Sequence, residues 1–424
     1  MLVSLIRFGL KGWIDAYYIA PTFHFTYAGL SWVKPWTAYG LPAWTLYAHW
    51  FILCLCCVAI VLGVYYRWAC LLFFVGFSYL ELIDKTFYLN HYYAISLFAL
   101  LMCFLPLDQS FSWQERKPVP LPQWALTVLR LQVGLIYFFA GIAKINGDWL
   151  LLAEPLRRWL PALASTPVLG FFFLIPATAW LMSWMGMLFD VGIVFFLASP
   201  RWRHLAYAAV VSFHLLTALL FPIGLFPWLM MFMALLFFPA DWPLRLRAFL
   251  PGRPFATVPG AKRALPDRRT YSMSRSVACF LCLFFGVQTV MPLRHWAYPG
   301  NVLWTEEGFR FAWNVMLIEK TGWVEFVLKD PDSGKQWIDQ STELTPFQER
   351  MMSTQPDMIL QYAHHLGATH ARTYPRLEVY AESYAALNGR PSQWLVSPYT
   401  NLRDYGHNMW PKPFIVPLQQ SAQR

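Results

Sequence analysis

Long runs of apolar residues, separated by short polar segments, dominate the first 295 residues of the chain. The run at residues 44–66 contains one histidine and no formal charge, and it exceeds the roughly 20 residues that span a bilayer. Because lipid cannot hydrogen-bond to an open backbone, we expect such runs to form membrane helices. Comparable runs follow at residues 91–106, 124–143, 170–198, 204–239 and 277–291.

Two of these runs, residues 170–198 and 204–239, are long enough to contain two passes each. Pro176 in the first run, and Pro222 with Gly224 in the second, are the expected breaks. Membrane helices tolerate such breaks where protein or water surrounds the freed backbone groups.

From residue 296 onwards the pattern changes to that of a small α+β region. Residues 324–328 and 336–338 read as strands on either side of an Asp-Pro-Asp-Ser-Gly stretch, which predicts a hairpin. Thr345 and Pro346 then open a helical segment, with Thr345 as the N-cap and Pro346 at the first helical position.

The composition is that of a membrane protein. Hydrophobic residues make up 57% of the chain and charged residues 13%, whereas soluble domains carry about 25% charged residues. We therefore predict an all-α polytopic membrane helix bundle of about eight spanning or re-entrant helices over residues 1–295. The α+β region follows over residues 296–424. Residues 1–10 show no cleavable signal and are expected to be the tail of a helix.

Much of the net charge of +10 lies in one segment between Pro243 and Arg275, where Asp267 is the sole acid. A short basic loop between apolar segments marks the cytoplasmic side of a membrane, so we prefer this reading to nucleic-acid binding. The helix that begins near Ser276 would then carry the C-terminal region to the extracytoplasmic side. The basic residues of the loop are Arg245, Arg247, Arg253, Lys262, Arg263, Arg268, Arg269 and Arg275.

Lys144 follows directly after an apolar run, where an ionisable residue costs about 2.5–3.5 kcal/mol on insertion scales. Polar or small residues precede Lys144 at helical spacing, including Tyr137 and Arg130, and Asp148 follows it. This face is expected to point into the protein or toward a cavity. The alternative is that Lys144 extends to the membrane interface.

Two further groups of polar residues interrupt the apolar pattern. Asp84, Asn90 and His91 lie between two apolar runs, and they could equally belong to a surface loop or an interfacial aromatic belt. Asp190 and His214 each stand alone in apolar surroundings, where a satisfied core residue is the simpler reading. No His-x-x-x-His or Glu-x-x-His spacing accompanies them, so we predict no metal site.

Several stretches resemble the vitamin K-dependent gamma-glutamyl carboxylase family. Residues 84–93 are similar to its Asp-(Lys/Gln)-Thr…Asn-His-(Tyr/Ser)-Tyr signature, and residues 137–149 resemble the motif that holds its catalytic lysine. Residues 213–226 contain a third block. Residues 304–308 and 383–390 resemble the bacterial members, which carry the horizontally transferred transmembrane (HTTM) domain.

The resemblance implies a lyase that couples oxidation of a reduced naphthoquinone to its epoxide with carboxylation of glutamate residues. Reduced vitamin K would be the cofactor, and O2 and CO2 the co-substrates, with no metal. The implied partners are the lipid bilayer, the quinol and a glutamate-containing protein or peptide, but no nucleic acid. The resemblance to bacterial members implies a multi-pass protein of the cytoplasmic membrane, whose first residues correspond to the end of the family's first membrane helix.

Matching positions imply Lys144 as the catalytic base, with Asn90 and His91 orienting or assisting it. The implied cofactor-binding residues are His214, Asp190, Tyr137, Arg130 and Asp84. A lysine amine is charged in water, so it acts as a base only where burial favours its neutral form. Two alternatives stay open: a quinol epoxidase without carboxylation, and a non-catalytic membrane binding or assembly protein that retains the fold.

Overall fold

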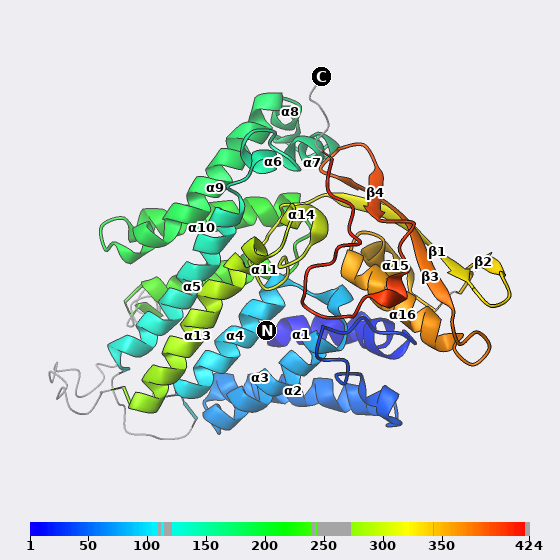
Figure 1. Cartoon of the computed structure of the whole chain (residues 1–424). Helices are drawn as coiled ribbons and strands as arrows, with labels where there is room; N and C mark the ends of the chain where they lie inside the picture. Colours follow the sequence, from blue (N-terminus) through cyan, green and yellow to red (C-terminus); the bar gives the residue numbers. More distant parts are fainter. Residues whose placement is uncertain (109–111, 114–120, 240–241, 244–272, 342, 420–424) are drawn as a thin grey trace.

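The computed structural model describes residues 1–424 except 109–111, 114–120, 240–241, 244–272, 342 and 420–424 (Figure 1). Most of the basic loop predicted between Pro243 and Arg275 therefore lies outside the described residues. Helices occupy most of the chain up to Ala297, and a sheet region with its own helices follows.

Within the described ranges, six helices are long and apolar enough to cross a membrane. They are α2 (Trp44–Leu62), α3 (Tyr66–Ile83), α5 (Gln123–Ala143), α9 (Pro176–Ala198), α10 (Arg203–Leu220) and α13 (Arg275–Leu293). Two shorter apolar helices, α4 (Asn90–Phe104) and α11 (Phe226–Ala234), accompany them. The chain is a multi-pass membrane protein, and the predicted helical bundle is confirmed. The short helices before α9 and at the start of the chain are α1 (Leu2–Leu10), α6 (Gly147–Leu150), α7 (Leu156–Ala162) and α8 (Gly170–Phe173).

The two expected helix breaks are present. Pro176 begins α9 after α8 has ended at Phe173, so the first long apolar run is divided where the proline stands. The second run is interrupted between Leu220 and Phe226, and Gly224 in this connection has a left-handed backbone with φ of 63°. Because glycine has no Cβ, it adopts this conformation at little cost.

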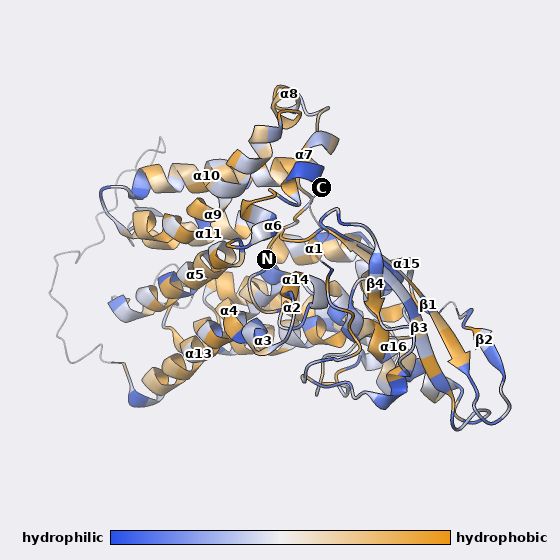
Figure 2. Cartoon of the chain, turned by 45° about the horizontal axis from the view of Figure 1, so that its top comes forward, coloured by the Kyte–Doolittle hydropathy of each residue, from blue (hydrophilic) through white to orange (hydrophobic). Residues whose placement is uncertain are grey.

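Helices α5 and α9 pack closely against each other where Gly141, near the end of α5, meets Val191 of α9. A Cβ added to Gly141 of α5 would lie 2.6 Å from Val191 Cγ2 and 2.7 Å from Val191 N, so only glycine allows this approach. Small residues bring membrane helices together in this way. Apolar residues also cover much of the outward surface of the long helices, as the hydropathy colouring indicates (Figure 2).

The C-terminal region contains a four-stranded antiparallel sheet with strand order β2-β1-β3-β4. Strand β1 pairs with β2 through the predicted turn, with Val327 opposite Ile338, and it pairs along its length with β3. The predicted hairpin is therefore confirmed. The strands are β1 (Lys320–Lys329), β2 (Gln336–Ile338), β3 (Glu378–Leu387) and β4 (Gln393–Val396).

Three helices accompany this sheet: α14 (Val302–Thr305), α15 (Pro346–Met352) and α16 (Pro356–Thr369). Helix α15 begins as the sequence predicts, because Thr345 Oγ1 accepts a hydrogen bond from Gln348 N and Pro346 follows the cap. Such a cap typically contributes about 1 kcal/mol. The predicted small α+β region is thus also confirmed.

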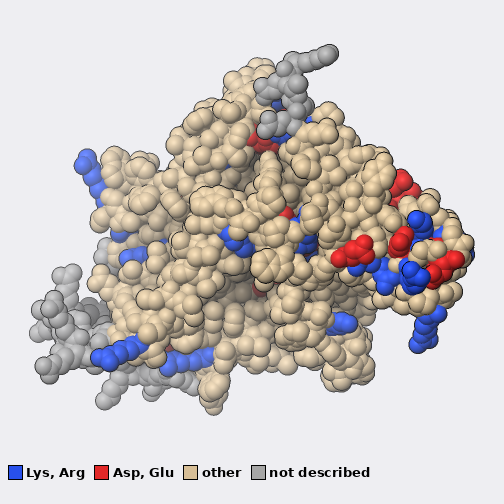
Figure 3. All heavy atoms as spheres, viewed as in Figure 1, with Lys and Arg blue, Asp and Glu red and all other residues tan. Residues whose placement is uncertain are grey.

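One hydrophobic core joins the two regions of the chain. It contains buried side chains of the membrane region such as Phe173 and Leu220 together with Trp304, Phe326 and Met358 of the C-terminal region. On the face seen in Figure 3, acidic and basic side chains gather together over the sheet region, whereas the helical part shows basic side chains near its edges and little charge between them. This distribution agrees with a helical part in lipid and a sheet region in water.

Candidate functional site

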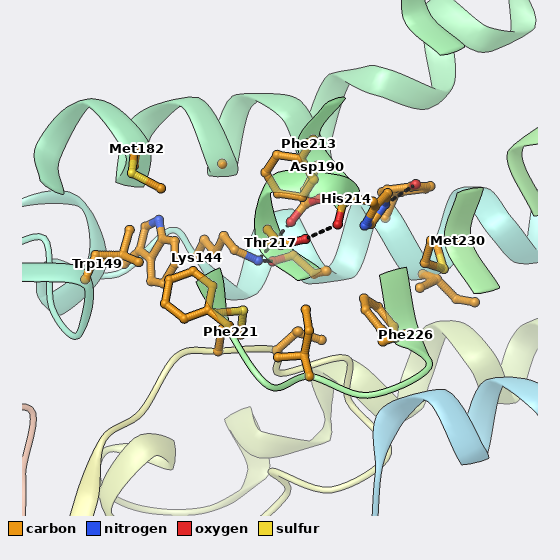
Figure 4. A pocket seen from close by; sticks show the side chains of 18 residues that line it. Lys144, Trp149, Met182, Asp190, Phe213, His214, Thr217, Phe221, Phe226 and Met230 are labelled. Carbon is orange, nitrogen blue, oxygen red and sulfur yellow. Dashed lines mark hydrogen bonds and ion pairs between the residues drawn. The ribbon is translucent and has the colours of Figure 1, made fainter. Parts of the chain in front are cut away.

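Lys144 directly follows α5, and its amine points back into the helical bundle (Figure 4). Its Nζ donates to Asp190 Oδ2 at 2.8 Å and to the carbonyl oxygen of Ala140 at 3.1 Å. Lys144 is 5% exposed and Asp190 6% exposed, so both ends of this ion pair are removed from solvent. The amine does not extend to the surface, which was the alternative reading of the sequence.

A second polar pair lies on the same pocket, which we call the Lys144 pocket. Tyr137 of α5 and His214 of α10 share a hydrogen bond of 2.8 Å between Tyr137 Oη and His214 Nε2, and both side chains are buried. Thr217 Oγ1, one turn further along α10, donates to the carbonyl oxygen of His214 at 3.0 Å. The two polar pairs therefore come from three different helices.

The rest of the Lys144 pocket is apolar and rich in aromatic and methionine side chains. The indole of Trp149 lies 5.3 Å from Lys144 Nζ, and its Nε1 donates to the carbonyl oxygen of Ser183 at 2.8 Å. Further lining residues are Met182, Phe213, Phe221, Phe226, Met230, Val315 and Met316 (Figure 4). Such a lining suits a flat apolar molecule with one or two polar groups.

Val315 and Met316 bring the C-terminal region into the wall of the pocket. Met316 has a left-handed backbone with φ of 58°, and Trp313 and Phe311 in the same segment share this conformation. Left-handed backbones are uncommon for bulky residues and persist only where the surrounding structure enforces them. Trp313 is fully buried, and this packing holds the segment in place.

Asp84 and Asn90 lie elsewhere, where the α3–α4 connection meets the C-terminal region. The carboxylate of Asp84 accepts hydrogen bonds from Thr86 N at 2.9 Å and from Gln348 Nε2 at 3.0 Å. Asn90 Nδ2 donates to the carbonyl oxygen of Asn314 at 2.9 Å. These residues join the membrane helices to the C-terminal region and do not line the Lys144 pocket.

His91 and Arg130 do not reach Lys144 either. His91 does not line the Lys144 pocket, although the centroid of the Phe226 ring lies 6.5 Å from that of His91 and 6.4 Å from that of His214. Arg130 Nε donates to the carbonyl oxygen of Leu236 at 2.8 Å and thereby caps the chain after α11. Of the site residues named from the sequence, the structure brings together Lys144, Asp190, His214 and Tyr137.

A charged cluster that the sequence did not predict lies beneath the α3–α4 connection. Lys85 Nζ donates to Asp357 Oδ2 at 2.7 Å, and Arg310 Nη1 donates to the same oxygen at 2.9 Å. Burial lowers the pKa of Lys85 to about 8, although Asp357 favours its charged form. Burial alone raises the pKa of Asp357, but Arg310 and Lys85 together hold it well below its usual value.

Trp149 also lines the pocket, and no role was predicted for it from the sequence. It stands within residues 137–149, which were singled out as the lysine-bearing motif, but nothing in the spacing showed that its ring faces the amine. A tryptophan near the end of a membrane helix is more simply read as an interfacial anchor.

Two family models match the chain. The model described as HTTM domain matches residues 1–242, and the model described as vitamin K-dependent gamma-carboxylase, lumenal domain, matches residues 273–421. The second match begins just before α13, although the change from apolar helices to the sheet region comes after Ala297. A search of solved structures gives no significant match.

Proposed function

The chain belongs to the vitamin K-dependent gamma-carboxylase family, and we propose that it is a membrane enzyme that oxidises a reduced naphthoquinone in the Lys144 pocket. The observation that carries this proposal is the buried ion pair of Lys144 and Asp190 on the wall of an apolar pocket. In this family, reduced vitamin K and O2 together supply the base that removes a γ-proton from glutamate, and CO2 then adds at that carbon.

The residues of the pocket fit such a cofactor chemically. Its apolar wall, with Phe221, Phe226 and Met230, suits a fused ring system that arrives through the lipid. The Lys144–Asp190 and Tyr137–His214 pairs, together with Thr217, supply most of the pocket's polar side chains, and hydroxyl groups of a quinol would find partners there. The same apolar wall keeps water away from a strong base, which water would otherwise quench.

Lys144 and Asp190 act in this proposal as one proton acceptor. The two groups share one proton, and the pair is neutral overall whether that proton is on the amine or on the carboxylate. When it accepts a further proton from a hydroxyl group, the pair becomes positively charged and compensates the negative charge left on the donor oxygen. His214 and Tyr137 hold the other end of the bound molecule and so fix its orientation.

We infer further that the C-terminal region lies on the extracytoplasmic side. The second matched model is described as a lumenal domain, and the apolar helix α13 precedes the sheet region. A glutamate-containing peptide would approach the Lys144 pocket from this side, past the segment that contributes Val315 and Met316. Carboxylation would therefore take place beneath the C-terminal region.

The test is chromatographic detection of vitamin K epoxide from purified protein supplied with reduced vitamin K and O2. Lys144→Ala should form no epoxide above background, and a small added amine should restore part of the activity. Lys329→Ala is the matched control, because its amine is half-exposed and belongs to the sheet region. Full activity of Lys144→Ala would exclude this lysine as the base that accepts a proton from the quinol.

Incorporation of labelled CO2 into a glutamate-containing peptide separates the full reaction from its first half. Label in the peptide together with epoxide supports the carboxylase, whereas epoxide without label supports a quinol epoxidase. A native protein that neither binds nor consumes the quinol would support the non-catalytic binding protein.

A further inference from the structure

The carboxylate of Asp148 links the membrane region to the C-terminal region next to the Lys144 pocket. Asp148 lies on α6, four residues after Lys144, and is buried. Arg390 binds it through two hydrogen bonds, Nη1 to Oδ2 at 2.7 Å and Nη2 to Oδ1 at 2.5 Å. Asn388 Nδ2 donates to Oδ2 at 2.9 Å. A bidentate contact of this kind fixes both distance and orientation.

Asn388 and Arg390 flank Gly389 in the tight turn between β3 and β4. Asn388 and Gly389 have φ of 47° and 72°, the left-handed pair that Asn-Gly sequences favour in hairpins. A Cβ on Gly389 would lie 1.4 Å from Arg158 Nη2, so the turn is inserted directly against α7. The Asn388-Gly389-Arg390 turn therefore contacts the membrane region at two residues, Asp148 and Arg158.

On the other side of α6, Trp149 faces the pocket. Its ring lies 5.3 Å from Lys144 Nζ, while Asp148, the residue before it, faces Arg390. Asn146 Oδ1 accepts from Trp149 N at 2.9 Å and caps α6, and Asn146 Nδ2 donates to the carbonyl oxygen of Ala143 at 2.9 Å. The short connection between Lys144 and α6 is therefore held at both ends. A displacement of Asp148 would thus move Trp149 and the lysine together.

The same turn also contacts the segment that contributes Val315 and Met316 to the wall of the pocket. Asn388 Nδ2 lies 3.3 Å from the carbonyl oxygen of Leu317, and Asn388 Oδ1 accepts from Glu319 N at 2.9 Å. Leu317 directly follows Met316, which lines the pocket. One asparagine side chain therefore contacts both Asp148 of α6 and the segment that contributes Met316 to the pocket.

We propose that the Asn388-Gly389-Arg390 turn positions the Lys144 amine, through Asp148, which precedes Trp149 of the pocket, and through Leu317, which follows Met316 of the pocket. Its effect on catalysis rests on the proposed function, but its effect on the lysine does not. Arg390 and Asn388 touch no reacting atom in this proposal, so they are positioning residues.

The first measurement is the rate at which an acylating reagent such as acetic anhydride modifies Lys144 in the full-length protein, followed by peptide mass spectrometry. Arg390→Gln removes the bidentate contact and should speed modification of Lys144 about tenfold. Arg390→Lys keeps one charged donor and should lie between Arg390→Gln and the native protein. Arg376→Gln, which removes an exposed ion pair with Asp332, is the matched control and should leave the rate unchanged.

Lys85 serves as an internal reference, because it is also buried but is paired with Asp357 outside the turn. Its modification should be equal in the native protein and in Arg390→Gln. If Lys144 is modified at the native rate in Arg390→Gln, or if Lys85 is accelerated to the same extent as Lys144, the positioning role is overturned.

The second measurement is the kinetics of epoxide formation. Loss of about an ångström of positioning can cost on the order of 100-fold in rate. Arg390→Gln should therefore lower kcat by about 10–100-fold and alter its pH profile, with partial rescue in Arg390→Lys. A native protein that forms no epoxide would refute the proposed function, while the labelling experiment would still decide the role of the turn.

Discussion

Lys144 and Asp190 come from different helices and meet at 2.8 Å inside the bundle. Gly141, three residues before Lys144, lies against Val191, the residue after Asp190, and this contact brings α5 and α9 together at the level of the ion pair. The distance between the amine and the carboxylate is therefore fixed by the packing of two helices.

Asp190→Asn should lower the rate of epoxide formation to about 1% of the native rate or less. The variant keeps the shape of the side chain but removes the anion, so Lys144 is left without its charged partner in apolar surroundings. Removing one member of a buried pair typically costs about 3–5 kcal/mol of unfolding free energy. Initial rates and melting temperatures measure the two effects. Asp332→Asn, at an exposed ion pair, is the control, and native-like rates in Asp190→Asn would contradict the paired acceptor.

Gly141→Ala should lower both the melting temperature and the rate of epoxide formation. The added methyl group would lie within 2.6 Å of Val191 Cγ2, so α5 and α9 must move apart. Overpacking of this kind costs about 1–3 kcal/mol. Gly286→Ala in α13 is the matched control, because its added Cβ meets nothing within 4 Å. Equal melting temperatures for the two variants would argue against a tight contact at Gly141.

Tyr137→Phe should weaken quinol binding more than it changes the fold. The substitution removes the hydroxyl group that contacts His214 Nε2 and leaves the ring in place. Loss of one hydrogen bond to the quinol costs about 0.5–1.5 kcal/mol, which corresponds to a roughly 2–10-fold rise in KM if the pair orients the quinol. Kinetics over a range of quinol concentrations test this. Tyr399→Phe, at a fully exposed tyrosine, should behave as the native protein; an unchanged KM in Tyr137→Phe would remove the pair from the binding site.

The contribution of Lys85 to stability should increase with pH. Burial lowers its pKa to about 8 in the folded protein, against the opposing influence of Asp357, whereas an unfolded lysine titrates near about pH 10.4. Between these values the unfolded chain holds more protons at this position, so the free energy of unfolding rises with pH across this window.

Melting temperatures of the native protein and of Lys85→Met, measured from about pH 8 to pH 10, test this sign. The difference between native protein and variant should shift in favour of the native protein as the pH rises. Lys329→Met, at a half-exposed lysine, provides the comparison for effects of pH on the rest of the chain. A difference that is constant or falls with pH would show that the folded pKa of Lys85 is not lowered.

The sequence was sufficient to identify the membrane bundle, the hairpin and the cap of α15, because each depends on local patterns. It also singled out Lys144, Asp190 and His214, since polar residues are costly within apolar helices. Their meeting was not readable from the sequence, because it depends on how α5, α9 and α10 pack.

Arg130 shows the limit of reading helical faces. It shares a face with Lys144, but fourteen residues at 1.5 Å per residue separate the two by about 20 Å along the axis. Its guanidinium therefore reaches the chain after α11 instead of the pocket. Long sequence separation hides other contacts: Lys85 and Asp357 are 272 positions apart, and no local pattern connects them.

The position of Met316 in the pocket bears on chimeras built from two members of the family. The lysine belongs to the stretch matched by the first family model, whereas Met316 belongs to the stretch matched by the second. A chimera that takes residues 273–421 from another member would keep Lys144 and replace Met316 in the wall of the pocket. Selectivity among quinones of different ring substitution could thus diverge without any change in the helices.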